Sequence, residues 1–444
     1  MHGADLVIRG RRVVTPEGER PGSVHVADGT IERVSTFEDV PDDGPVADAG
    51  DLVVLPGLVD THVHVNEPGR AEWEGFATAT RAAAAGGVTT LIDMPLNSIP
   101  PTTTVDALGE KRAAAEGDVH VDVGFWGGAV PGNLGRLREL HEAGVFGFKS
   151  FLCPSGVDEF PSLDPEQVRT AMEEIARFDG LLIVHAELPG PIEAASAALT
   201  EADPLAFATY LASRPPEAEE RAVAEIVAAS AATGCRTHVL HVSAAGCLDL
   251  LAGAVTAETC PHYLTFAAEE IADGATEFKC APPIREDANR ERLWDGLRGG
   301  KVAAVVSDHS PCTPQLKEGS FFDAWGGIAS VQLGVRAVWT EARARGFGVE
   351  DVSRWMSAGP AELAGLRDKG TVAEGMDADL VVFDPDRRET VDASELHHRH
   401  PTTPYAGRTL DGRVVATYVR GMEVYREGRH RDDPVGRLLS RGSA

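Results

Sequence analysis

The sequence predicts an α/β protein in which a (β/α)8 barrel carries a small β-sandwich built from both ends of the chain. Apolar runs of strand length alternate with helical segments through the middle of the chain, which is the pattern of parallel βα repeats. Short strands with turn signals stand before and after that region. The 444 residues are enough for one large domain and one smaller domain.

Residues 1–54 are expected to form the N-terminal part of the sandwich. Strands are expected at Asp5–Arg9, Arg12–Val14, Ser23–Ala27 and Thr30–Val34. Between the last two, Asp28-Gly29 is a strong signal for a tight hairpin, because both residues tolerate the backbone angles of such a turn. Nothing in this segment resembles a chemical motif, so we expect it to be structural.

Residues 55–369 are expected to form the barrel. Its strands are expected at eight apolar runs, which are Leu58–Val65, Val88–Met94, Val119–Phe125, Val145–Phe151, Leu181–Val184, Thr237–Val242, Ala254–Thr259 and Val302–Ser307. The segment Glu217–Thr233 illustrates the helices between them. An apolar stripe runs along it, prolines stand near its start, and Gly234 follows its end.

Residues 370–444 are expected to complete the sandwich and to end in a tail. The predicted strands are Leu380–Phe383, Val414–Arg420 and Met422–Tyr425. The stretch Asp384–Arg408 is rich in proline, histidine and charge, which predicts a surface loop. The tail from Gly428 is polar and basic, and we expect it to be mobile.

Composition excludes several classes of function. The formal charge of -28 argues against a nucleic-acid partner, because phosphate binding needs a basic patch. No apolar run approaches the ~20 residues that a membrane span needs, and the first residues do not resemble a signal peptide. The six cysteines are scattered, with no Cys-x-x-Cys pair, as expected for free thiols in a reducing compartment. We therefore expect a cytoplasmic protein with a small-molecule substrate and no membrane contact.

Side chains that can bind metal ions stand at the carboxyl ends of predicted strands, where barrel enzymes place their active sites. They are His62, His64, Lys149, His185, His241 and Asp308. One histidine at such a place is usually structural, and a bare His-x-His pair is more often hydrogen-bonded than metal-bound. The occurrence of all six at matching strand ends instead favours a metal centre. His238 points to the other side of its strand from His241 and is assigned to packing. His309 faces away from Asp308 and is assigned a position behind the metal ligands.

Lys149 needs a separate argument, because an ammonium group has no lone pair to offer to a cation. A buried lysine with a lowered pKa can react with carbon dioxide to form a carbamate. This anion has two oxygen atoms and can bridge two cations. The alternative is an ion pair between Lys149 and Asp308 or Asp60. The histidines around Lys149 favour the carbamate, and thus an N6-carboxylysine.

The segment Asp60-Thr61-His62-Val63-His64, together with the other four residues, resembles the binuclear metal signature of the cyclic amidohydrolases. These are the hydantoinases, dihydropyrimidinases, dihydroorotases and allantoinases, and the resemblance covers nearly the whole chain. It implies two divalent metal ions. One would be bound by His62, His64 and Asp308, the other by His185 and His241, with carboxylated Lys149 between them. It also implies a homotetramer.

The flanking residues resemble those of the allantoinases. They are His64-Val65-Asn66-Glu67-Pro68-Gly69-Arg70, Glu72-Trp73-Glu74-Gly75, Asp93-Met94-Pro95-Leu96-Asn97-Ser98 and Lys149-Ser150-Phe151-Leu152. Dihydroorotases carry an arginine where this chain has Asn66, which suits a neutral substrate. Hydantoinases and dihydropyrimidinases carry a tyrosine shortly after the bridging lysine, whereas this chain has no tyrosine between Lys149 and Tyr210.

The expected reaction is hydrolytic ring opening of (S)-allantoin to allantoate in purine breakdown. Two cations that share a water lower its pKa and so provide hydroxide near neutral pH. This hydroxide would attack the ring carbonyl, and Asp308 would pass its proton to the leaving ring nitrogen as general acid/base. Substrate contacts are expected, by position, from Asn97, Cys153, Ser155, Ser310 and His262.

Two other interpretations remain at this point. One is a hydantoinase- or dihydropyrimidinase-like cyclic amidase, and the other is a non-catalytic scaffold with the same fold. The presence of all six ligand-type residues argues against the scaffold. The ligand set favours zinc but would also accept Co, Mn, Fe or Ni, and carbon dioxide would be needed to carboxylate Lys149.

Overall fold

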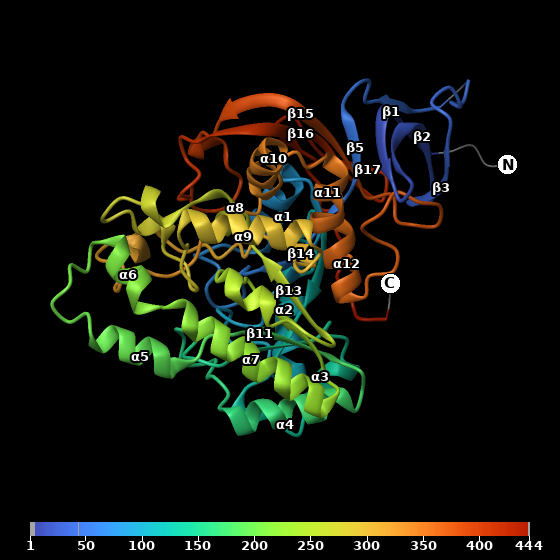
Figure 1. Cartoon of the computed structure of the whole chain (residues 1–444). Coiled ribbons are helices and arrows are strands. Elements are labelled where there is room, and N and C mark those ends of the chain that lie inside the picture. The colour runs from blue at the N-terminus through green and yellow to red at the C-terminus, as the bar shows by residue number, and fades with distance from the viewer. Residues whose placement is uncertain (1–4, 43, 443–444) are drawn as a thin grey trace.

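The computed structural model describes residues 5–42 and 44–442, in which a barrel is flanked by a β-sheet from the two ends of the chain (Figure 1). One parallel barrel sheet contains β6 (Leu58–Val63), β7 (Val88–Asp93) and β8 (Asp122–Phe125). The other contains β9 (Gly127–Gly128), β10 (Phe148–Phe151), β11 (Leu181–His185), β12 (Arg236–Val239), β13 (Val255–Thr259) and β14 (Ala304–Val305). The chain runs from β8 almost directly into β9, and Val63 bridges His309, so the ring closes. The predicted barrel is confirmed.

The eighth strand is shorter than predicted. Pairing extends only over Ala304–Val305, whereas the apolar run continues to Ser307. The chain leaves the regular ladder because the backbone N–H of Ser307 donates to the carboxylate of Asp60 at 3.2 Å. Asp308 then takes a left-handed conformation with φ 44°. This turn directs the Asp308 side chain toward the end of β6.

Helices surround the barrel strands (Figure 1). They are α1 (Phe76–Ala85), α2 (Val105–Ala115), α3 (Leu137–Glu142), α4 (Pro165–Ala176), α5 (Pro189–Ala197), α6 (Phe207–Ser213), α7 (Pro216–Thr233), α8 (Pro261–Thr265), α9 (Asp287–Arg298), α10 (Gly334–Ala344), α11 (Val349–Ser353) and α12 (Gly359–Ala364). The ends of α7 match the sequence signals, since Gly234 caps it in a left-handed conformation with φ 70°. Among the described residues, no helix is long and apolar enough to cross a membrane.

Strands from both ends of the chain meet in one nine-stranded sheet. The N-terminal strands are β1 (Leu6–Thr15), β2 (Gly18–Ala27), β3 (Thr30–Ser35), β4 (Val46–Asp48) and β5 (Val53–Pro56). The C-terminal strands are β15 (Leu380–Thr390), β16 (Thr409–Val419), β17 (Met422–Arg426) and β18 (Arg429–His430). The two sets are joined where β5 pairs antiparallel with β15, so that Val54 lies opposite Val382. Hydrogen bonds thus link what we predicted as a sandwich into a single continuous sheet, with β1–β3 standing away from the barrel (Figure 1).

A buried charge cluster connects the barrel to this sheet. Nζ of Lys369 donates to the carboxylates of Asp122, Asp377 and Asp379 at 2.9, 2.8 and 2.8 Å. The guanidinium of Arg420 also binds Asp122. Asp122 belongs to barrel strand β8 and Arg420 follows sheet strand β16, so the cluster fixes one domain against the other.

The expectation of a mobile tail from Gly428 is wrong for the part of the tail that the structure describes. The backbone N–H of Gly436 donates to Val119 at 2.9 Å, and that of Leu439 donates to Val123 at 2.8 Å. The backbone N–H of Val123 in turn donates to Arg437 at 2.9 Å. The tail is held in place because its backbone pairs with β8 and with the residues just before it, a tertiary contact that its polar composition does not reveal.

The loop between β15 and β16 does not lie free on the surface. His398 is buried, and the backbone N–H of Arg399 donates to the carboxylate of Glu74 at 3.1 Å. Nε2 of His400 lies 2.7 Å from the carbonyl of Glu72. The loop therefore packs on the segment that links β6 to α1, close to the end of the strand that carries His62.

Candidate metal centre

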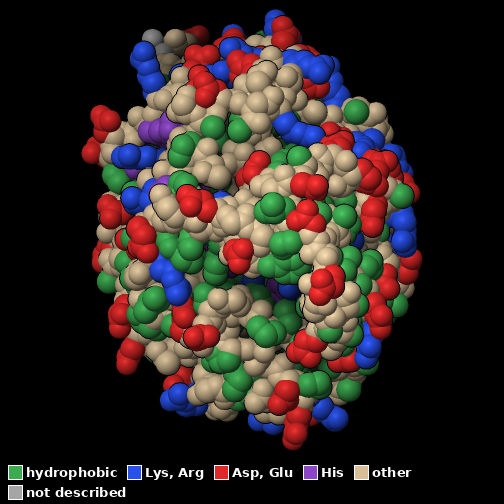
Figure 2. All heavy atoms as spheres, turned by 90° about the vertical axis from the view of Figure 1, so that its left-hand side faces the viewer, with side chains coloured by type: hydrophobic (Ala, Val, Ile, Leu, Met, Phe, Trp, Pro, Cys, Tyr) green, Lys and Arg blue, Asp and Glu red, His purple; other side chains and the backbone are tan. Residues whose placement is uncertain are grey.

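A cavity of about 470 Å³ opens at the carboxyl ends of the barrel strands. Its lining includes five of the six predicted metal ligands, which are His64, Lys149, His185, His241 and Asp308. The sixth, His62, is fully buried beneath them. Figure 2 shows a hollow near the middle of one face, with histidine and basic side chains visible inside it. The structure thus brings all six predicted side chains to one place.

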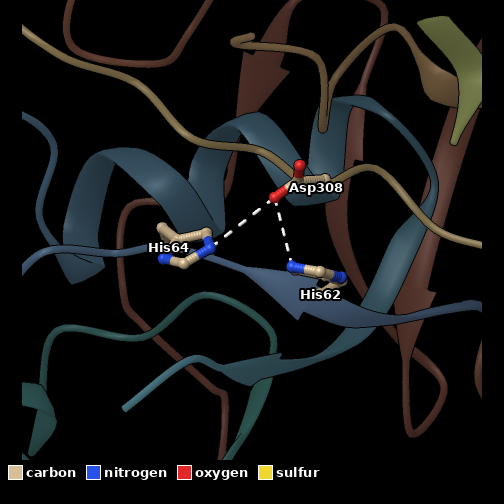
Figure 3. Close-up of side chains that lie close together, drawn as sticks. All are labelled: His62, His64 and Asp308. Atoms are coloured by element: carbon tan, nitrogen blue, oxygen red, sulfur yellow. Dashed lines mark ion pairs between the residues drawn. The ribbon is translucent and has the colours of Figure 1, made fainter. Parts of the chain in front are cut away.

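His62, His64 and Asp308 converge on a single point (Figure 3). Oδ1 of Asp308 lies 3.1 Å from Nε2 of His62 and 3.6 Å from Nε2 of His64. The ligand atoms of all three residues lie within 4.8 Å of one another. Nε2 of His62 is buried and makes no hydrogen bond to any described residue. A buried imidazole nitrogen that faces a carboxylate and a second imidazole fits a divalent cation.

His185, His241 and Lys149 form the other half of the cluster. The ring centroids of His185 and His241 lie 4.6 Å apart, and those of His62 and His241 lie 5.3 Å apart. His241 has φ 37°, the left-handed conformation that Asp308 also adopts. Such backbone strain concentrates at functional sites. Nζ of Lys149 lies 4.8 Å from the ring centroid of Phe151 and makes no hydrogen bond or ion pair to the residues that the structure describes.

The electrostatics keep most of these groups in the form that binds cations. Burial lowers the pKa of His64 and of His241 well below the usual value, so both imidazoles are neutral. Burial also lowers the pKa of Lys149 to about 8. Burial opposes ionisation of Asp308, but His62 and the other histidines hold the pKa of that carboxyl well below its usual range. Burial opposes protonation of His62, but the carboxylates of Asp308 and Glu258 raise its pKa. Asp308 is therefore an anion that lies close to the neutral imidazoles of His64 and His241.

Two buried carboxylates orient the histidines, and the sequence analysis assigned a role to neither. Nδ1 of His62 lies 2.6 Å from Oε1 of Glu258, whose other oxygen lies 3.1 Å from Nε2 of His238. Nε2 of His185 lies 2.8 Å from Glu187, which is also bound by Arg214. Each carboxylate fixes which ring nitrogen carries the proton and leaves the other facing the cluster. Glu187 stands two residues after His185, just past the end of β11, and this short spacing is a signal that could have identified it.

The predicted substrate contacts divide into two groups. Asn97, Ser155 and Ser310 line the cavity. Cys153 and His262 do not line it, because they are buried behind it at 2% and 0% exposure. Cys153 lies beside Glu187 and Arg214, and burial raises the pKa of its thiol to about 12. The ring of His262 packs on Tyr263 at a centroid distance of 4.2 Å, and neither of its nitrogens has a hydrogen-bond partner among the described residues.

Several lining residues were not predicted. Tyr210 and Arg214 reach the cavity from α6 and its C-terminal cap, and Lys279 reaches it from a loop far along the chain. Tyr210 comes from α6, and its hydroxyl donates to the carbonyl of Cys280 at 2.7 Å. The chain thus places a tyrosine at the cavity by a different route from the one expected of a hydantoinase. No local motif distinguishes these residues from ordinary helix and loop positions.

Fold and site together define a barrel with a centre for divalent cations, the arrangement of a metal-dependent hydrolase. Residues 53–424 match the model of the amidohydrolase family. An allantoinase from Streptomyces avermitilis is 55% identical over 99% of this chain and 100% of its own length. An allantoinase from Arabidopsis thaliana is 44% identical over 97% of this chain and 90% of its own length.

Solved structures agree with this assignment. The L-hydantoinase (dihydropyrimidinase) from Arthrobacter aurescens superposes with a TM-score of 0.93 at 32% identity, and the match covers 99% of this chain and 100% of that one. The chain belongs to the amidohydrolase family.

Proposed function

We propose that this protein hydrolyses the ring amide of allantoin, most readily the (S) enantiomer, to give allantoate in purine breakdown. One observation carries the proposal. A buried cluster of four imidazoles, a carboxylate and an unpaired lysine lies at the cavity of a chain whose relatives over nearly its full length are named allantoinases. A neutral ring with several carbonyl and N–H groups suits a cavity lined by polar side chains and backbone.

The ligand assignment that we propose follows the two halves of the cluster. His62, His64 and Asp308 would hold one divalent ion, and His185 and His241 would hold the other. Two bound ions would supply Lewis acidity, both to the attacking water and to the ring carbonyl. His, carboxylate and carbamate ligands accept several metals, of which we favour zinc. Metal analysis of the protein as purified, expected to give two ions per chain, is the check.

Carboxylation of Lys149 is part of the same proposal. With a pKa lowered to about 8, a substantial fraction of the amine is neutral near physiological pH. The neutral amine can attack carbon dioxide, form an N–C bond and release one proton, which leaves an anionic carbamate. The burial of Lys149 and its lack of a described partner support this, since an ammonium group between two cations would be strongly disfavoured.

Asp308 is the proposed general acid/base. Its carboxylate is ionised, lines the cavity and stands next to His62 and His64. It would take a proton from the attacking water and deliver it to the ring nitrogen as the C–N bond breaks. Asn97, whose amide nitrogen lies 3.4 Å from Nδ1 of His64, and Ser310 would orient the substrate at the cavity wall.

A hydantoinase-like activity is the second candidate, and the close superposition on an L-hydantoinase favours it. Initial rates on allantoin, hydantoin, dihydrouracil and dihydroorotate decide between the two. We expect kcat/KM for allantoin to exceed that for each other ring by at least about tenfold. A higher value for hydantoin or dihydrouracil would select the second candidate. If the protein binds two ions but hydrolyses none of these rings, the non-catalytic scaffold is the interpretation that remains.

Assembly and location complete the proposal. We propose a homotetramer, which light scattering at micromolar concentration tests, and a monomer there would contradict it. We also propose that the protein works in the cytoplasm. All six cysteines are free and buried, which suits a reducing compartment.

A further inference from the structure

Lys317 binds backbone carbonyls behind the cavity wall instead of a carboxylate. It ends the short 3-10 turn Pro314–Lys317. Its Nζ donates to the carbonyl oxygens of Gly327 at 2.6 Å, Trp325 at 2.9 Å and Lys279 at 3.4 Å. No described carboxylate forms an ion pair with it, and burial lowers the pKa of its ammonium group. The side chain is half-buried, and its ammonium group is bound to three backbone carbonyls rather than to a carboxylate, which suggests that it holds these peptide groups in place.

The three carbonyls belong to two stretches that form one wall of the cavity. Residues 279–281 and residues 324–327 both line it, whereas Lys317 does not. The stretches also contact each other directly, because the backbone N–H of Gly327 donates to the carbonyl of Lys279 at 2.9 Å. Lys317 therefore lies behind the wall and ties its two halves together.

The bonds to Lys317 also decide where the neighbouring N–H groups point. In a trans peptide the C=O and N–H point in opposite directions. Because the carbonyls of Lys279 and Trp325 bind Lys317, the N–H groups of Cys280 and Gly326 point away from Lys317, and both residues line the cavity. Neither N–H has an acceptor among the described residues, although Cys280 is only 1% exposed. A buried N–H group such as that of Cys280 is rarely left unpaired, and both residues stand at the wall of the proposed substrate cavity.

We propose that Lys317 is a positioning residue for substrate binding, which orients and polarises the peptide groups of Cys280 and Gly326 so that their N–H groups donate to oxygen atoms of the ring substrate. The inference rests on the proposed function for the identity of the ring. A cation bound to the carbonyl end of a peptide strengthens the N–H at the other end as a donor. Lys279 supports the same wall, since its Nζ binds the carbonyl of Ala324.

The test replaces Lys317 by methionine, which keeps the length of the side chain and removes the charge and the donors. We expect KM of Lys317→Met to rise about tenfold, with kcat within about threefold of wild type and the bound metal unchanged. The matched control is Lys301→Met, because Lys301 is exposed and pairs only with the surface residue Asp249. A folded Lys317→Met protein with wild-type KM would overturn the proposal. A fall in kcat of about tenfold together with loss of bound metal would also overturn it.

A second variant covers the case in which Lys317→Met does not fold. Lys317→Gln keeps two donors on a shorter neutral side chain, and we expect a KM increase of about threefold to fivefold, whereas a wild-type KM would refute the role. The measurements use whichever ring the wild-type protein hydrolyses fastest. Failure on allantoin would therefore count against the proposed substrate, and an unchanged KM would count against Lys317 alone.

Discussion

Glu258 should determine how tightly the site holds metal, although it does not touch the cavity. Its carboxylate accepts from Nδ1 of His62 at 2.6 Å and from Nε2 of His238 at 3.1 Å, and it is fully buried. Burial alone would raise the pKa of Glu258, but the two histidines bring it to about 2, so it is an anion at working pH. The perturbation we choose is Glu258→Gln, which keeps the shape and removes the charge.

The size of the effect follows from those contacts. The glutamine oxygen can still accept from one histidine, but its NH2 then faces the N–H of the other, so at least one charge-assisted hydrogen bond is lost. Such bonds contribute about 1.5–3 kcal/mol. Loss of a group that orients a metal ligand typically costs about 10–100-fold in metal affinity, which corresponds to about 1.4–2.7 kcal/mol. We expect Glu258→Gln to fall in that range.

The assay is metal content after dialysis against graded concentrations of a chelator. Glu217→Gln is the matched control, because Glu217 is an exposed residue of α7 that pairs only with Arg221. The variant should lose metal at chelator concentrations about 10–100-fold lower than the control. Equal retention in the two proteins would refute the view that Glu258 orients His62 for a cation.

Three further changes test the site and the fold. His241→Ala should lose metal and activity together, and near-normal turnover with two bound ions would contradict the binuclear assignment. Lys149→Ala should be nearly inactive and bind metal poorly, with partial recovery when a small carboxylic acid is added. An intact mass that shows an unmodified Lys149 in fully active wild-type protein would refute the carbamate. Lys369→Met leaves the buried carboxylate of Asp379 without its cation and Asp122 with Arg420 alone, and should lower the free energy of unfolding by about 3–5 kcal/mol in urea. A loss below about 1 kcal/mol, compared with the exposed-site control Lys301→Met, would contradict that role.

The sequence contained enough to predict the barrel and the cluster at its mouth. Apolar runs of strand length recur through residues 55–369, and parallel strands connected by helices place their carboxyl ends on one side. Since His62, His64, Lys149, His185, His241 and Asp308 stand at such ends, their convergence followed from topology alone. The structure confirms the barrel and brings these six side chains together.

The contacts around the cluster could not be predicted in this way, because they join residues far apart in the chain. Glu258 lies 196 positions from His62, and no local pattern marks it as the partner of that imidazole. For the same reason Cys153 and His262, which stand just after barrel strands β10 and β13, are turned behind the cavity. The alternation of side chains along a strand predicts the face to which each strand residue points, but it does not predict how deeply a residue in the following loop is buried.

What the sequence determined by itself was therefore the order of the strands, the identity of the ligand-type residues and the end of the barrel at which they meet. These depend on local periodicity and on the regular geometry of βα repeats. Only the tertiary structure decided that the tail pairs with β8, that the β15–β16 loop packs on Glu74, and that Lys317 ties two stretches of the cavity wall. Each of these depends on hydrogen bonds in which at least one partner is a backbone group brought into place by folding, and every residue type carries such groups.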